Sequence, residues 1–189
     1  MPTDPTAEQQ VRDFARVGVR AGLLSADELH AEVVEAITTE LPDRAGEAEV
    51  LADAWVGEAR EQLRVDQEGW PEATDHERLQ TAFDELEIAD VVVLQGCEDH
   101  WAAKRLIEER AAAGDPPRGV AWFTPADVWH AVDEGMLEVN LWHGTTANAA
   151  PGDEILDDVL GTLEKHGLRA RFDEGRIEVD AHWHKRTSA

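Results

Sequence analysis

Hydrophobic positions in the first half of the chain recur at the spacing of α-helices. Residues 6–22, 25–41 and 47–67 each place apolar side chains three or four positions apart, opposite a charged face. Thr6 and Ser25 begin the first two segments, and a Gln or Glu follows each of them three residues later, which is the pattern of a capping box. The N-terminal part of the chain is therefore predicted to be helical.

Short apolar runs in the second half of the chain predict β-strands. Residues 88–94 contain three consecutive valines, which is typical of a strand buried on both faces, and residues 120–123 form a second run. Leu137, Val139 and Leu141 alternate with polar residues, as in a strand with one buried face. Helices predicted around these strands cover residues 74–86, 99–113, 125–134 and 153–166.

The segment 119–144 organises this half of the chain. Thr124 offers a helix N-cap, Pro125 suits the first helical position, and Asp127 places an acid where the helix dipole favours one. Gly135 predicts a left-handed end to the helix. The segment should therefore fold as a strand, a short helix and a second strand.

Near the C-terminus, Glu174-Gly175 lies between two strand-like runs and predicts a hairpin with a two-residue loop. That register collects three apolar pairs on one face and three opposite-charge pairs on the other, a separation typical of a paired hairpin. The apolar pairs are Phe172–Ile177, Ala170–Val179 and Leu168–Ala181. The charged pairs are Asp173–Arg176, Arg171–Glu178 and Arg169–Asp180.

These elements predict an α+β fold, in which N-terminal helices precede a mixed sheet of about five strands. Helices are interleaved with the strands, and the sheet ends in the antiparallel hairpin. We expect residues 1–70 to form an acidic helical segment packed on the rest, and residues 71–189 to form the α+β domain.

The net charge of the chain limits the kinds of molecule that it could bind. The chain holds 41 acidic residues against 17 Lys and Arg, a net charge of −24. Direct binding to nucleic acid phosphates needs a basic surface, which this composition excludes. A basic protein partner is one explanation for the acidity, and an acidic, solvated surface without a partner is the other.

If the acidity serves a partner, the exposed acids of the second and third helices are the candidates. We call them the acidic face, and its members are Glu32, Glu35, Glu40, Glu47, Glu58 and Glu61. No apolar run approaches the roughly 18 residues that span a bilayer, and the first ten residues lack the features of a signal peptide. We therefore expect a cytoplasmic protein with no membrane partner.

From about residue 20 onward, most of the chain resembles an uncharacterised actinobacterial family of unknown function. The resemblance is carried by WPxxTDxxRL from Trp70, by the Ala-Phe and Leu-Glu pairs that follow it, and by DxxxAV…G from Asp127 to Gly135. Members of that family have a Cys-Cys-x-x-Cys turn and a His-Gln-Gln-Asp helix start. This chain has the single Cys97 and Thr124-Pro125-Ala126-Asp127 instead. The resemblance thus implies that any chemistry of those family residues is absent here, and it brings no established activity.

Four residues near predicted strand ends are candidates for chemistry. Cys97 and His100 could act as nucleophile and base, or as two ligands near His143, with Thr124 close by. The alternative is that Cys97 is a small core residue, as a lone cysteine after a buried strand usually is. Since a single cysteine excludes a multi-cysteine zinc site, we expect no cofactor.

Two further pairs have both a chemical and a structural interpretation. Asp127 and His130 lie one helical turn apart and could form an acid–base pair, although capping alone accounts for Asp127. His182 and His184 alternate along the last strand, a spacing that can present two imidazoles to zinc. Because the apolar residues occupy the opposite face, we expect these histidines to face water and bind no metal.

Two functional hypotheses follow from these patterns. The first is a non-enzymatic interaction protein, of the inhibitor or immunity type, whose acidic face engages a basic partner. The second is a metal- or ligand-binding protein or an enzyme, with a site around Cys97, His100, Thr124 and His143. A concave pocket that collects those four residues would favour the second hypothesis.

Overall fold

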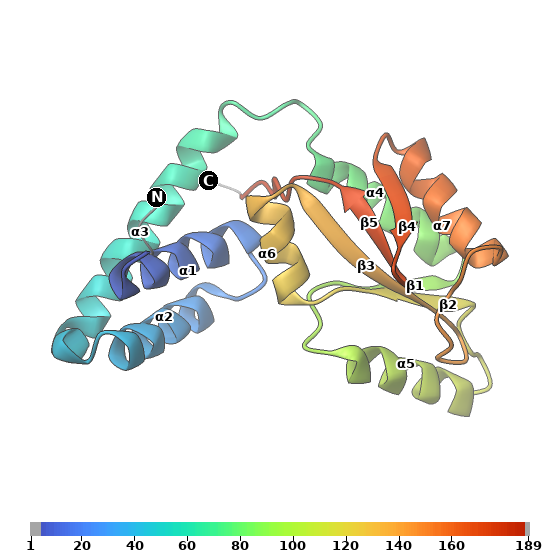
Figure 1. The fold of residues 1–189 in the computed structure, drawn as a ribbon, viewed down its shortest axis with the longest axis horizontal. Helices are drawn as coiled ribbons and strands as arrows, with labels where there is room; N and C mark the ends of the chain where they lie inside the picture. Colours follow the sequence, from blue (N-terminus) through green and yellow to red (C-terminus); the bar gives the residue numbers. More distant parts are fainter. Residues whose placement is uncertain (1–4, 188–189) are drawn as a thin grey trace. The chain divides into compact units, whose positions relative to one another are not determined.

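A computed structural model describes residues 5–187 of the chain. Within this range the chain divides into two compact units, one formed by residues 5–71 with 185–187 and the other by residues 72–184. We call them the helical unit and the sheet unit (Figure 1). None of the helices within the described residues combines the length and the apolar character needed to cross a membrane.

The helical unit is built from segments whose ends are set by local signals. Its elements are α1 (Ala7–Ala21), α2 (Ala26–Glu40), the 3₁₀ helix η1 (Pro42–Glu47) and α3 (Ala48–Gln67). The predicted capping boxes of Thr6 and Ser25 are both confirmed. Gly22 ends α1 with a φ of +58°, in the left-handed region that glycine favours.

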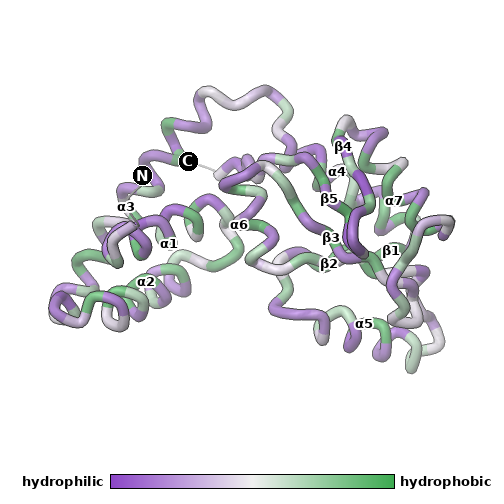
Figure 2. The backbone as a smooth tube through the Cα atoms, viewed as in Figure 1, coloured by the Kyte–Doolittle hydropathy of each residue, from purple (hydrophilic) through white to green (hydrophobic). Residues whose placement is uncertain are grey.

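Apolar stripes of α1, α2 and α3 meet in the core of the helical unit, where Val33, Ile37 and Trp55 are buried. Figure 2 shows hydrophobic and hydrophilic residues alternating along these three helices. The end of the chain also packs on this unit. The Lys185 ammonium donates to the carbonyl oxygen of Gly22 at 2.7 Å, and Thr187 forms hydrogen bonds with the Gln67 side chain.

The sheet unit contains five strands in the order β1-β2-β3-β5-β4, of which β1 and β2 are parallel and the other neighbours antiparallel. The predicted α+β fold with a mixed sheet is thereby confirmed. Its strands are β1 (Val91–Leu94), β2 (Gly119–Trp122), β3 (Met136–His143), β4 (Arg169–Asp173) and β5 (Arg176–Asp180). Its helices are α4 (Asp75–Ile88), α5 (His100–Ala112), α6 (Pro125–Asp133) and α7 (Glu154–Lys165).

Helices cover both faces of this sheet. Helix α5 packs on one face through a cluster that contains Ala103, Ile107, Val120 and Trp122. Helix α4 contacts β1, α7 contacts β4, and the two helices contact each other (Figure 1). Side chains on both faces of β1 and β2 pack against apolar residues. The sequences of these strands are therefore continuous apolar runs rather than alternating patterns.

The first strand is shorter than predicted. The prediction that it begins at residue 88 was wrong. Helix α4 continues to Ile88, whose side chain is 88% exposed. Asp90 then turns the chain in the left-handed region, with a φ of +61°, and its carboxylate accepts the backbone N–H of Arg118 at 3.0 Å. This hydrogen bond fixes the turn, so β1 begins only at Val91.

The hairpin register is confirmed for every pair that lies within the strands. Arg169 forms an ion pair with Asp180 at 2.9 Å, and Arg171 forms one with Glu178. Arg176 lies opposite Asp173 but pairs with Glu138 of the neighbouring strand β3. The charges of the hairpin therefore also help to hold β5 against β3.

One boundary of the predicted segments differs from the units of the structure. The sequence placed the whole C-terminus with the sheet, whereas residues 185–187 pack on the helical unit. Residues 1–4 and 188–189 of the predicted segments lie outside the described residues. Packing of the helical segment on the rest of the chain stays a prediction.

Candidate functional site

The acidic face divides into paired and unpaired carboxylates, although all six glutamates are exposed. Glu47 pairs with Arg44 at 2.9 Å, Glu58 with Arg12 at 3.4 Å and Glu61 with Arg64 at 2.8 Å. Glu32, Glu35 and Glu40 all belong to α2 and have no ion pair within residues 5–187. The reason is local, because α2 contains no Lys or Arg.

Cys97 and Thr124 come together at the carboxyl ends of the parallel strands β1 and β2. The Cys97 amide donates to the carbonyl oxygen of Phe123, and its sulfur lies 3.6 Å from the same oxygen. Burial, together with the nearby charges of Asp99 and Asp127, raises the pKa of the thiol. Since the thiolate is the reactive form, this environment opposes a nucleophilic role for Cys97.

Within residues 5–187 the Cys97 sulfur has the carbonyl oxygens of Asp99 and Phe123 as hydrogen-bond partners, and no hydrogen bond joins it to the His100 ring. His100 is exposed at the start of α5, and its ring packs on Trp101 at 4.6 Å and faces Trp142 at 6.4 Å between centroids. The structure therefore gives Cys97 and His100 different neighbours, although they are three residues apart.

Asp127 acts as the capping residue that the sequence predicted. Its carboxylate accepts the Thr124 N–H at 2.7 Å and the Thr124 hydroxyl at 2.8 Å, and the residue is buried. His130, one turn later, is exposed. Asp127 is thus occupied in holding the start of α6.

His143 lies away from Cys97, at the other end of β2. Its pairing partner in the sheet is Gly119, the first residue of that strand. There the His143 ring nitrogen lies 2.9 Å from the Asp153 carboxylate, beside Arg118 in a shallow hollow of about 290 Å³. The structure therefore does not collect Cys97, His100, Thr124 and His143 in one pocket.

The Asp153 carboxylate should make the free energy of unfolding fall as the pH is lowered. Hydrogen bonds from His143 and from the Ala150 N–H hold its pKa below the ordinary value of 3.8. Because the pKa is depressed in the folded state, the stabilisation is fully present above the unfolded value and is lost as the pH falls below it. Asp153→Asn should therefore lose less stability than the parent protein between about pH 5 and pH 3 in urea titrations.

Asp157→Asn provides the matched control for that measurement. Asp157 is an exposed acid of α7, the helix that begins directly after Asp153. Its side chain has no ion pair within the described residues. A parallel pH dependence of the parent protein and Asp153→Asn would show that the contacts of Asp153 do not stabilise the fold.

His182 and His184 stack rather than converge. Their rings lie 5.2 Å apart with an angle of 11° between planes, beyond the end of β5. Ala181 and Trp183 are buried on the opposite side, as the alternation predicted. Within residues 5–187 no group of three or more His, Cys, Asp or Glu side chains is arranged to hold a metal ion.

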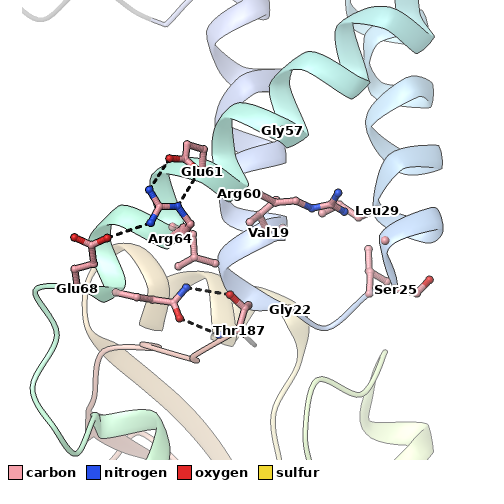
Figure 3. A pocket seen from close by; sticks show the side chains of 15 residues that line it. Val19, Gly22, Ser25, Leu29, Gly57, Arg60, Glu61, Arg64, Glu68 and Thr187 are labelled. Atoms are coloured by element: carbon pink, nitrogen blue, oxygen red, sulfur yellow. Dashed lines mark hydrogen bonds and ion pairs between the residues drawn. The ribbon is translucent and has the colours of Figure 1, made fainter. Parts of the chain in front are cut away.

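A hollow in the helical unit has no counterpart among the sequence predictions. It has a volume of about 840 Å³ and is bounded by α1, α2, α3 and Thr187 (Figure 3). We call it the helical groove. Its lining includes Gly18, Val19, Gly22, Leu24, Leu29, Gly57, Arg60, Leu63 and Arg64. The local signals were Gly18 and Gly57, because a glycine inside a helical pattern costs helix stability and so invites an explanation.

Comparison with known proteins identifies a family whose function is unknown. A formimidoylglutamase of Corynebacterium efficiens (strain DSM 44549 / YS-314 / AJ 12310 / JCM 11189 / NBRC 100395) is 36% identical over 76 residues, which are 35% of this chain and 24% of that protein. The match therefore spans about a quarter of that protein's length. No solved structure matches the chain. The model of a domain of unknown function, DUF6891, matches residues 4–187, and the chain belongs to that family.

Proposed function

We propose that this chain is a non-enzymatic interaction protein that engages a basic protein partner through its acidic face. The observation that supports this proposal most is the unpaired charge of α2. Glu32, Glu35 and Glu40 are exposed and have no ion pair within residues 5–187, whereas arginines pair with the other three members of the acidic face. An unpaired carboxylate gives a partner's cation an interaction without first breaking an internal one.

The paired half of the acidic face should contribute less to this recognition. Hydrogen bonds from Arg64 hold the pKa of Glu61 below its ordinary value and occupy its oxygens. A partner would have to displace Arg64 before it could use that carboxylate. The proposed contact surface is therefore centred on α2, with α3 at its margin.

The enzymatic alternative has less support. The Cys97 thiol has a raised pKa, His100 packs on tryptophans, and His143 lies at the opposite end of β2. The partial similarity to a formimidoylglutamase does not bring an activity to this chain, because the match spans about a quarter of that protein. An inhibitor or immunity role, an actinobacterial family and a cytoplasmic location stay predictions.

A charge-matched comparison tests the proposal. Replacing Glu32, Glu35 and Glu40 with glutamine should slow association with a basic partner captured from the native host by about 3- to 10-fold at low salt. The difference should shrink towards 300 mM salt, because screening shortens the range of the field. Surface plasmon resonance on the isolated partner measures both effects.

The control variant removes the same number of negative charges from the paired acids of the acidic face. Glu47→Gln, Glu58→Gln and Glu61→Gln together should slow association less than the α2 variant. Equal effects of the two triple variants would point to net charge alone, and association rates that do not vary with salt would remove the electrostatic role altogether.

A further inference from the structure

The helical groove combines an apolar floor with an arginine that lacks a counter-ion. Arg60 lines both this groove and a smaller hollow of about 290 Å³ next to it. Figure 3 shows its side chain extending from α3 toward Leu29 of α2. No carboxylate forms an ion pair with Arg60 within the described residues, although the chain holds 41 acids. The guanidinium is therefore available to an anion from outside.

The floor beside Arg60 is suited to an apolar group. Val19 and Leu63 are buried at its base, and Leu24 remains 38% exposed within it. Gly57 keeps the wall beside Arg60 open, since a Cβ added there would meet no atom within 4 Å. The groove volume of about 840 Å³ lies within the range of small-molecule sites, about 300–1,000 Å³.

We propose that the helical groove binds a small amphipathic monocarboxylate, with its carboxylate on Arg60 and its apolar body along Val19, Leu24 and Leu63. An arginine binds a carboxylate through two parallel hydrogen bonds, which fixes the orientation of the ligand. The apolar body gains by leaving water, in proportion to the area that the floor covers.

The charged side chains around the groove favour a ligand with one negative charge over a ligand with two. Arg64 also lines the groove, but Glu61 and Glu68 already neutralise it, at 2.8 and 3.1 Å. A dianion such as a phosphate monoester would therefore find one available guanidinium, with Glu61 and Glu68 in the same groove and Asp27 and Asp53 in the adjoining hollow. Their repulsion offsets the gain from the second charge.

The test compares decanoate, decanol and decyl phosphate by isothermal titration calorimetry on the full chain. Decanoate should bind at least about tenfold more tightly than decanol, and Arg60→Gln should remove that advantage, because a hydrogen-bonded charge pair is lost. Decanoate should also bind more tightly than decyl phosphate. Gly57→Leu should abolish binding by filling the groove, and Gly57→Ala should weaken it.

Matched variants outside the groove separate binding from folding. Arg105 is an exposed arginine of α5 without an ion pair in residues 5–187, and Gly161 of α7 also has open space around an added Cβ. Arg105→Gln and Gly161→Leu should leave decanoate binding unchanged, while circular dichroism shows that the groove variants stay folded.

Four results of these titrations would overturn the proposal. They are the absence of decanoate binding, equal affinity for decanol, unchanged affinity in Arg60→Gln, and tighter binding of decyl phosphate. Tighter binding of an acetylated octapeptide with a free C-terminal leucine would also overturn it, because the carboxylate would then belong to a polypeptide. None of these results depends on the acidic face of α2.

Discussion

Phe123→Ala is expected to lower the free energy of unfolding of the sheet unit by about 3–5 kcal/mol. Phe123 is completely buried, directly after β2. Its ring lies 5.9 Å from that of Phe83 on α4 and 6.0 Å from that of Trp183. The cavity left by the substitution would be bounded by Phe83 of α4 and by Trp183, which follows β5, and these two elements cannot both close on it.

Urea denaturation followed by circular dichroism measures this loss. Trp129→Ala is the control, since Trp129 is an aromatic residue of α6 in the same unit but is 39% exposed. Its removal should cost less than that of Phe123, because part of its side chain is already in water. A loss for Phe123→Ala no larger than that for Trp129→Ala would show that its surroundings collapse into the space.

Features of the fold that depend on neighbouring residues could be predicted from the sequence. The capping boxes at Thr6 and Ser25 each join residues three positions apart, so the sequence contains the whole interaction. The hairpin is similar, because a two-residue loop fixes which residues lie opposite one another.

Features that depend on strand direction could not be predicted in this way. The site proposed around Cys97 and His143 assumed that the ends of successive strands meet at one edge of the sheet. Helix α6 instead returns the chain antiparallel to β2, so the end of β3 lies beside the start of β2. His143 consequently contacts Asp153 rather than Cys97, and no local pattern in the sequence marked that pair.

The helical groove was missed for a related reason. Its walls come from three helices and from Thr187, and each helix by itself shows only an ordinary amphipathic stripe. Whether Arg60 finds a carboxylate depends on how those helices pack, which the periodicity of each helix does not determine. A structure was needed to show that this guanidinium is left without one.

Gly144→Ala is expected to destabilise the sheet unit by about 3 kcal/mol, because its added Cβ would collide with backbone. Gly144 follows β3, and its N–H donates to the carbonyl oxygen of Arg118 at 3.0 Å. A Cβ at this position would overlap the carbonyl oxygen of Pro117 and lie 3.0 Å from its carbonyl carbon. Neither atom belongs to a flexible side chain, so the loop itself would have to move.

That movement should also disturb the contact between His143 and Asp153, since His143 immediately precedes the substituted residue. Gly161→Ala is the control, because Gly161 lies inside α7 with open space around an added Cβ. There the same substitution should raise the free energy of unfolding by about 0.5–1 kcal/mol, the usual cost of glycine in a helix. Thermal unfolding of both variants should therefore shift in opposite directions from the parent protein. A Gly144→Ala protein as stable as the parent would show that the segment containing Pro117 yields readily, and that close backbone packing does not hold this end of β3 in place.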